Sequence, residues 1–363
     1  MAYPRVALFF HQSAANATLS YQHGWPRAFC ESQLLCCEPF NLANRSIADV
    51  VNIAAALYRG RFDAIVLLHS TFSNTQELRR LLFLAVAASR LPKIFFIGNE
   101  YKSMPEKMRF CRRLGIDMLI SQSNHPDVLA MYEQALGCRV ASVPNTGFDS
   151  AVFFPAVPLA ARCVDIGYRA YEAPWYLGNN EKAEIAGYFL RNASSLGLAT
   201  DISLDATERF DSSGYAAFLN RCRGHIGTEA GGDYFELTGE TRSRFMAYMS
   251  VHPDASWNEV KRQFFEDYGP SVPMRIISGR QVEAAACKTV QIMFDGRYNG
   301  YFRADEHFIS LKKDYSNIDE VMQKFRDDDC CRRMVDSAYE VAMQELTYPA
   351  LIKKFVTAMQ EVL

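Results

Sequence analysis

The sequence predicts an α/β protein with two Rossmann-like domains that face each other across a cleft. Short apolar runs rich in β-branched and aromatic residues alternate with longer segments of helical periodicity, which is typical of βαβ units and a parallel sheet. The alternation stops at a turn-rich stretch near the middle of the chain and then begins again. A length of 363 residues agrees with two domains, and a hydrophobic content of 49% is enough for two cores.

The first domain is expected to span residues 1–157 and to alternate strands with helices. The expected strands are Val6–Phe10, Ala64–His69, Lys93–Ile97, Asp117–Ser121 and Arg139–Val143. The expected helices are Ile47–Arg59, Gln76–Ser89, Pro105–Leu114 and Pro126–Leu136. The stretch PNTGFDSAVFFPAVP then brings three prolines and several turn-forming residues, a composition that indicates a linker.

The second domain is expected to span residues 158–345, with residues 233–274 as an insertion that interrupts the alternation. The expected strands are Val164–Tyr168, Thr200–Leu204, His225–Thr228 and Val290–Phe294. The expected helices are Glu181–Ser195, Ser213–Arg223 and Gln281–Cys287, with Thr241–Ser250 and Ser256–Asp267 inside the insertion. Three further helices are expected from about residue 318 to the end of the chain.

Composition and missing motifs exclude several classes of function. With 39 basic and 41 acidic residues, the net charge of −2 gives no broad electrostatic surface for nucleic acid. The sequence contains no GxxxxGK[ST], GxGxxG, GxSxG or HExxH motif, which disfavours kinases, dehydrogenases, serine hydrolases and zinc proteases. Neither a secretory signal nor a membrane span is apparent, and the ten cysteines form no CxxC pair. We therefore expect a cytoplasmic protein, with attachment to the inner face of a membrane left open.

In the second domain, candidate ligand residues follow the strands, because doubly wound sheets bind ligands beyond the carboxyl ends of their strands. Arg169 is a candidate for a diphosphate, the alternative being a surface salt bridge. Glu229 is suited to a sugar or ribose hydroxyl, and Gly231 and Gly232 allow close approach of a ligand to the backbone. Glu283 lies among small alanines and suggests a ribose contact, the alternative being a capping or salt-bridge residue.

The polar loop after residue 294 supplies further candidates, since loops between regular elements often carry sites. Tyr298 and Asn299 are expected near the donor, and so is His307, for which a buried structural role is equally acceptable. In the first domain, His11, His69 and Glu100 each follow a strand and are candidates for a general base or an acceptor contact. Aromatic faces for an acceptor are expected from Tyr21 and Trp25, which can equally be packing anchors.

Four segments of the sequence resemble GT-B fold glycosyltransferases. PNTGFDSAVFFP resembles their interdomain hinge, and VDIGYRA resembles the start of their donor domain. HIGTEAGGDYFELTG and the segment from ISGRQVEAAACKT to LKKDYSN are similar to bacterial glycosyltransferases of group 1, which build surface polysaccharides. The resemblance covers the hinge and the whole second half of the chain.

This resemblance implies transfer of a hexose from a nucleoside-diphosphate sugar to a glycan, lipid-linked or small-molecule acceptor, with retention. Glu283 matches the second of two donor-contacting glutamates of the family, and Glu229 is the match for the first, although residues 233–274 intervene. Arg169 carries over as the diphosphate-binding residue, with Lys182 as a candidate for the second basic residue. If the enzyme inverts instead, Glu100 would be the base. The final helix, within residues 346–363, would cross back to the first domain.

We expect no metal, because no DxD-like carboxylate cluster occurs where it would hold one. Two alternatives remain: a GT-B isomerase acting on a nucleotide-sugar, which would need a denser set of acids and bases, and a non-catalytic two-domain protein that binds sugar. The sequence leaves the nucleotide base, the sugar, the acceptor and the oligomeric state open.

Overall fold

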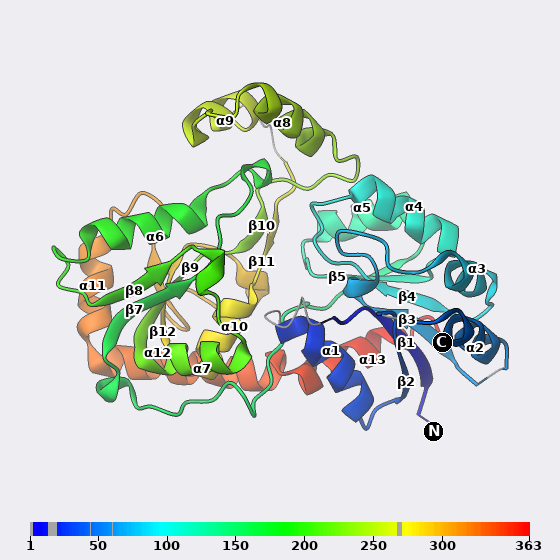
Figure 1. Ribbon diagram of the computed structural model, residues 1–363. Coiled ribbons are helices and arrows are strands. Elements are labelled where there is room, and N and C mark those ends of the chain that lie inside the picture. Colours follow the sequence, from blue (N-terminus) through cyan, green and yellow to red (C-terminus); the bar gives the residue numbers. More distant parts are fainter. Residues whose placement is uncertain (1–2, 14–19, 44, 60, 267–270) are drawn as a thin grey trace. The chain divides into compact units, whose positions relative to one another are not determined.

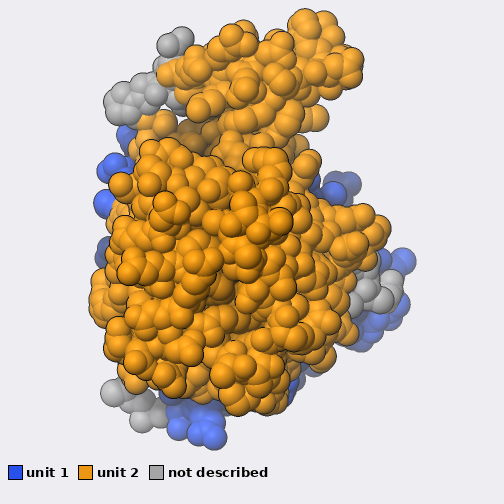
Figure 2. Space-filling model, turned by 90° about the vertical axis from the view of Figure 1, so that its left-hand side faces the viewer, with its two compact units in different colours: residues 1–145, 235–240, 348–363 blue, residues 146–234, 241–347 orange. Residues whose placement is uncertain are grey.

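The computed structural model describes residues 3–13, 20–43, 45–59, 61–266 and 271–363. The chain divides into two compact units, coloured separately in Figure 2. The first unit contains residues 1–145, 235–240 and 348–363, and the second contains residues 146–234 and 241–347. Each unit has its own parallel sheet with helices around it (Figure 1). Within the described residues, no helix is both long enough and apolar enough to cross a membrane.

The first unit contains a six-stranded parallel sheet in the order β2-β1-β3-β4-β5-β6. Four of its strands are almost completely buried, as expected when helices cover both faces of a parallel sheet. The strands are β1 (Arg5–Phe10), β2 (Cys36–Asn41), β3 (Ala64–Leu67), β4 (Lys93–Phe96), β5 (Met118–Ser121) and β6 (Arg139–Ser142). The helices are α1 (Ser20–Glu31), α2 (Ile47–Tyr58), α3 (Arg80–Ala88), α4 (Met104–Leu114), α5 (Pro126–Leu136) and, from the end of the chain, α13 (Tyr348–Met359).

Two elements of this unit were missing from the sequence-based expectation. Strand β2 is a half-exposed edge strand that contains Pro39, and proline is tolerated in strands only at such edges. Helix α1 contains Gly24 and Pro26, the two residue types with the lowest helix propensity. Helix α3 also begins later than expected, at Arg80, because Gln76 forms an isolated β-bridge with Phe72 instead of a helical turn.

Helix α13 packs against α1 inside the first unit. The Phe355 ring lies 5.2 Å from the Phe29 ring and 5.1 Å from the Phe96 ring, measured between centroids. A Cβ atom at Gly24 would lie 2.0 Å from a ring carbon of Tyr348. The glycine in α1 is therefore required by the close approach of the last helix.

The second unit contains a five-stranded parallel sheet in the order β13-β12-β9-β7-β8 and a separate antiparallel pair, β10 with β11. The strands are β7 (Val164–Arg169), β8 (Thr200–Ser203), β9 (Cys222–Gly227), β10 (Ala230–Gly232), β11 (Met274–Ile276), β12 (Val290–Phe294) and β13 (Ile309–Leu311). The helices are α6 (Glu181–Asn192), α7 (Ser212–Arg221), α8 (Glu240–Val251), α9 (Trp257–Phe264), α10 (Gly279–Ala286), α11 (Ile318–Arg326) and α12 (Asp328–Val341). The core lies between the sheet and α6, α11 and α12.

The expected insertion is a long segment that connects two strands of a small antiparallel sheet, β10 and β11. Strands β10 and β11 pair Gly232 with Met274, so the ends of the segment lie side by side. Helices α8 and α9 pack together through aromatic rings, with Phe264 at 5.3 Å from Tyr248 (Figure 1). Each strand of the hairpin has only three residues, too few to show a period in the sequence.

The proline-rich linker packs with the second unit. The first of the three segments that form the first unit ends at Asn145, whereas the boundary was expected at residue 157. The Phe153 ring is fully buried, and its centroid lies 6.5 Å from that of Tyr215 in α7. The apolar residues within this turn-rich stretch are anchors, which its composition alone did not indicate.

The contact between α1 and α13 gives a stability prediction. Gly24→Ala should lower the free energy of unfolding by about 1–3 kcal/mol, because the Tyr348 ring must move to admit the new methyl group. Gly187→Ala in α6 is the matched control. Its Cβ would meet only the flexible end of Arg191, so helix propensity should raise stability by up to about 1 kcal/mol. Urea unfolding of both variants measures this difference, and equal stabilities would contradict the assigned contact.

Candidate functional site

Basic side chains gather at the carboxyl edge of the sheet in the second unit. Lys182 lies in the first turn of α6, which follows β7, and Arg280 lies in the first turn of α10. Arg209 lies in the connection that follows β8. Tyr171 links two of them, since its ring centroid is 4.7 Å from the Lys182 Nζ and 4.9 Å from the Arg209 Cζ. We call Lys182, Arg209 and Arg280 the cationic cluster.

Lys182, the buried member of the cationic cluster, is poorly balanced by the protein, whereas Arg209 is exposed and Arg280 lies near Glu283. Lys182 is only 6% exposed, and its pKa is lowered to about 7 by burial and by the nearby Arg280, Arg275 and Arg209. Among the described residues, neither Lys182 nor Arg209 has an ion-pair partner, and the buried Nε of Arg280 has no hydrogen-bond partner. A buried cation without a partner is costly, so this arrangement favours binding of an anion.

The neighbouring Arg275 lies close enough to affect Lys182, but its own charge is neutralised by carboxylates. It donates two hydrogen bonds of 2.9 Å to the carboxylate of Glu181 and also pairs with Asp233. Lys313 makes a second ion pair with Glu181 at 2.6 Å. The positive charge available to a ligand therefore comes from the cationic cluster and not from Arg275.

The N-termini of α6 and α10 add to the positive potential of this edge. Helix N-termini carry a partial positive charge and normally exclude basic residues from their first turn. Lys182 and Arg280 both occupy such positions. This violation of the helix-dipole preference was the sequence signal for the site. The sequence-based prediction did not include Arg280, and it included Lys182 only because of the family resemblance.

Arg169, the expected diphosphate-binding residue, lies outside the cationic cluster and pairs with Asp201. Its guanidinium donates to the Asp201 carboxylate at 2.6 Å and to the Asp201 carbonyl at 2.9 Å. It also lies over the rings of Phe210 and Phe218, with the Cζ 4.8 Å from the Phe218 centroid. The alternative reading as a salt-bridge residue fits these contacts, because the donors of Arg169 are directed to β8 and α7.

Glu229, Gly231 and Gly232 lie close to the same edge, but their contacts are with the protein. One carboxylate oxygen of Glu229 accepts hydrogen bonds from the backbone N–H groups of Arg297 and Tyr298, and burial raises the pKa of this carboxyl. Gly231 has φ of +87°, and a Cβ there would lie 1.8 Å from the Met274 carbonyl. The glycines thus allow the β10–β11 pairing, while Glu229 retains a second oxygen for a ligand.

Glu283 is brought to the cationic cluster. It is 6% exposed, lies in the second turn of α10, and interacts electrostatically with Arg280. Gly279 lies just beside it, since a Cβ there would be 3.7 Å from a carboxylate oxygen of Glu283. The structure therefore leaves its predicted ribose contact open to test.

Tyr298, Asn299 and His307 are buried and hold the loop between β12 and β13. The Tyr298 hydroxyl donates to the Phe294 carbonyl at 2.6 Å, and the Asn299 side chain accepts from the backbone N–H of Ile277 at 2.7 Å. His307 is 3% exposed, and its Nδ1 accepts from the backbone N–H of Arg303 at 2.9 Å. The contacts of His307 fit the buried structural role given as its alternative, and the contacts of Tyr298 and Asn299 are likewise with the protein.

In the first unit, Glu100 is a buried carboxyl and not an exposed group at a rim. It accepts hydrogen bonds from the Ser121 hydroxyl at 2.7 Å, the Gln122 backbone N–H at 2.8 Å and the Tyr132 hydroxyl at 2.8 Å. Only 2% of Glu100 is exposed, and burial raises its pKa. Both oxygens are occupied, so Glu100 ties β5 and α5 together and is poorly placed to deprotonate an acceptor.

The four expected acceptor residues divide into two groups. His11, Tyr21 and His69 are neighbours: the Tyr21 and His69 ring centroids are 4.9 Å apart, and the His11 backbone N–H donates to the adjacent Ser70. Burial, followed by the charge of Lys107, lowers the pKa of His69 to about 3, which keeps the imidazole neutral. Trp25 is completely buried and donates to the Asn145 carbonyl at 2.8 Å, so it is a packing anchor.

No protein-family model and no curated protein sequence matches the chain. Its structure matches solved glycosyltransferases over nearly the whole length. HepE from Anabaena, in complex with UDP and glucose, has a TM-score of 0.51 with 11% identity, over 99% of this chain and 100% of that one. Sucrose-phosphate synthase from Thermosynechococcus elongatus has a TM-score of 0.54 with 10% identity, over 99% of both chains. The chain has the GT-B fold.

A third match is the phage T4 BGT in complex with its UDP-glucose substrate, at a TM-score of 0.53 and 9% identity over 98% of both chains. These identities establish the fold alone. The GT-B fold that the hinge and donor-domain segments indicated is thereby confirmed.

The low pKa of Lys182 gives a prediction for stability against pH. The folded pKa of about 7 lies below the ordinary value of 10.5, so between these pH values the unfolded chain binds one more proton at this site. The free energy of unfolding therefore rises as the pH increases from 7 to 10.5. The cost of burying Lys182 is largest at pH 7 and below, and it disappears above pH 10.5. Lys182→Met should be more stable than the parent near pH 7, and its advantage should shrink as the pH rises.

Urea unfolding at pH 6.5, 8 and 9.5 in buffers without phosphate tests this difference. Lys288→Met is the control, because that lysine is less buried and pairs with Asp336 at 2.7 Å. A stability difference between the Lys182 variant and the parent that does not change with pH would contradict the buried, partner-free position.

Proposed function

We propose that the chain is a glycosyltransferase that takes a hexosyl group from a nucleoside-diphosphate sugar. The observation that carries this proposal is the cationic cluster, in which the buried Lys182 has no ion-pair partner among the described residues and lies, like Arg280, at a helix N-terminus. A diphosphate supplies the missing negative charge. The GT-B neighbours support the proposal, since HepE was solved with UDP and glucose and phage T4 BGT with UDP-glucose.

In this proposal the cationic cluster stabilises the leaving diphosphate. Cleavage of the bond between the sugar and the diphosphate leaves negative charge on the departing oxygen, and cations already in place stabilise that charge without reorganisation. Lys182 and Arg280 contact the diphosphate, while the Tyr171 ring lies against both Lys182 and Arg209. The same cations would supply the charge stabilisation that some transferases obtain from a metal, so we propose a metal-independent reaction.

Two carboxylates are proposed to orient the donor. Glu283 beside Arg280 would accept hydrogen bonds from the ribose, and Glu229 would contact the sugar through the oxygen that faces Gly296. We propose retention of configuration, because the buried Glu100 is not placed as a base and front-face transfer needs none. The acceptor would be a glycan, a lipid-linked glycan or a small molecule. We propose that the transfer reaction takes place in the cytoplasm.

The proposed donor site predicts how nucleotides stabilise the protein. UDP should raise the melting temperature, since a ligand that binds only the folded state stabilises it in proportion to occupancy. Lys182→Met and Arg280→Gln should each weaken UDP binding about ten-fold or more, because each removes a charge-assisted contact. A thermal-shift titration with UDP, GDP, CDP and ADP measures both effects, and Lys288→Met, which keeps the cationic cluster, should bind like the parent.

Turnover separates the transferase from the alternatives. A glycosyltransferase should slowly release nucleoside diphosphate from the preferred donor when water replaces the acceptor, whereas a binding protein should show affinity without release. A nucleotide-sugar isomerase would convert the sugar without releasing the diphosphate. If none of the four nucleotides shifts the melting temperature, the donor-site assignment is wrong.

A further inference from the structure

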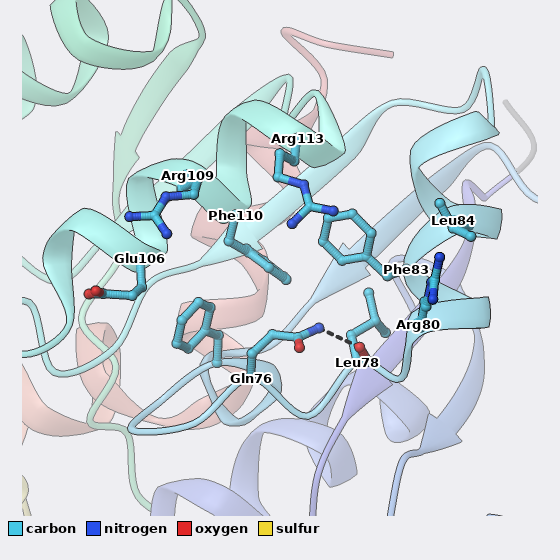
Figure 3. Close-up of a pocket in the computed structure, with 10 residues that line it drawn as sticks. Gln76, Leu78, Arg80, Phe83, Leu84, Glu106, Arg109, Phe110 and Arg113 are labelled. Atoms are coloured by element: carbon cyan, nitrogen blue, oxygen red, sulfur yellow. Dashed lines mark hydrogen bonds between the residues drawn. The ribbon is translucent and has the colours of Figure 1, made fainter.

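The first unit contains a cavity between α3, α4 and the segment that follows β3. It is separate from the cationic cluster of the second unit. Its volume is about 480 Å³, within the range of small-molecule sites. In Figure 3, phenylalanine rings line the hollow, and arginine side chains extend toward it from both α3 and α4. None of the residues proposed to bind the donor lines it.

The floor of this cavity is aromatic. Phe110 lies at its centre, with the Phe72 ring 5.2 Å and the Phe83 ring 5.8 Å from it between centroids. All three phenylalanines are buried, at 4–9% exposure. Leu84 on α3 also lines the cavity and is 52% exposed, so the apolar surface continues outward from the rings. The floor can therefore hold an apolar body that extends toward solvent.

The rim of the cavity is positively charged. Arg80, Arg109 and Arg113 line it, and among the described residues none of them has an ion-pair or hydrogen-bond partner. Arg113 lies over the Phe83 ring, with the Cζ 4.8 Å from the centroid. Glu106 is the one carboxylate among the lining residues, and in Figure 3 it points away from Phe110 and Phe83. Three cations against one anion favour a negatively charged ligand group.

The contacts favour an apolar chain over a nucleotide base. The Arg113 guanidinium already covers the Phe83 face on which a base would stack. The amide of Gln76, which could read the edge of a base, donates to the Leu78 carbonyl (Figure 3). An apolar chain needs neither a free ring face nor a hydrogen-bond donor.

From this combination we propose that the α3–α4 cavity binds a single amphiphile with a phosphate-type head and an apolar chain. The head contacts Arg109 and Arg113, and the chain lies on Phe72 and Phe110 and leaves past Leu84. The half-open hollow, with its buried aromatic floor, favours one molecule over the flat surface of a membrane. This inference does not depend on the donor site in the second unit.

Isothermal titration of the full chain with decyl phosphate, kept below its micelle concentration, tests the proposal. Decyl phosphate should bind at least ten-fold more tightly than inorganic phosphate, which lacks the chain, or decyltrimethylammonium, which reverses the charge. Affinity should rise about two- to four-fold for each methylene added between hexyl and decyl phosphate, as expected for apolar burial. Equal binding of the three probes would refute the proposal.

Variants locate the site. Arg109→Gln with Arg113→Gln should weaken decyl phosphate binding about ten-fold or more, because two charge-assisted contacts are lost. Arg112→Gln is the matched control, since Arg112 lies on the same helix but donates to the Ala135 carbonyl outside the cavity. Leu84→Ser, at an exposed position, should reduce the gain per methylene and leave the melting temperature near that of the parent.

Two results would overturn the assignment. Unchanged decyl phosphate binding in the double arginine variant, with a normal melting temperature, would place the amphiphile elsewhere. Binding to vesicles of anionic phospholipid without any binding of monomeric decyl phosphate would show that the arginines contact a membrane surface and that the cavity itself is not a ligand site.

Discussion

The second unit is organised around positive charge that its own residues do not neutralise. Lys182 and Arg280 begin α6 and α10, so two helix dipoles reinforce the charge that burial already makes costly. The surrounding Arg275, Glu181 and Lys313 form a network that is internally paired. That paired network lies beside Lys182, which has no ion-pair partner among the described residues. The unit therefore keeps a costly charge distribution in its folded state.

In the first unit, by contrast, the buried charged groups Glu100 and Lys107 are hydrogen-bonded by the protein itself. Glu100 has three hydrogen-bond donors, and the fully buried Lys107 donates to the carbonyls of Gly98 and Asn99. These groups are satisfied by the protein and stabilise the carboxyl edge of the sheet. His69 is the exception, with neither ring nitrogen paired among the described residues. Perturbed carboxyls and amines thus mark structure in one unit and a candidate ligand site in the other.

The sequence predicted the fold class, whereas the side-chain partners of the candidate site residues could not be read from it, for physical reasons. Buried strands and amphipathic helices follow from local patterns, and β2 and α1 were missed because proline and glycine weaken those patterns. Side-chain partners depend on register. Arg169 pairs with Ser203 across the sheet, which places Asp201, two residues earlier, on the same face and within reach. No local pattern encodes that alignment, so Arg169 was assigned to a ligand.

The loop after β12 shows the same limit. Its polar residues suggested a site, yet Asn299 and His307 are used to fix a backbone with several positive φ angles, including those of Tyr298 and Asn299. Polar side chains that stabilise such a loop cannot be told from ligand contacts by residue type. Lys182 and Arg280, in contrast, were marked by their position at helix starts, where basic residues are unfavourable.

The pairing of β10 with β11 brings together the two ends of the segment that carries α8 and α9. Because Gly232 is paired with Met274, the backbone enters and leaves α8 and α9 at neighbouring points of the second unit. The entropy of closing a loop grows only slowly with its length, so segments of quite different size can be exchanged at this junction without disturbing the sheet. The junction is thus a natural splice point, at which a helical arm can be added, removed or replaced while the five-stranded sheet is kept.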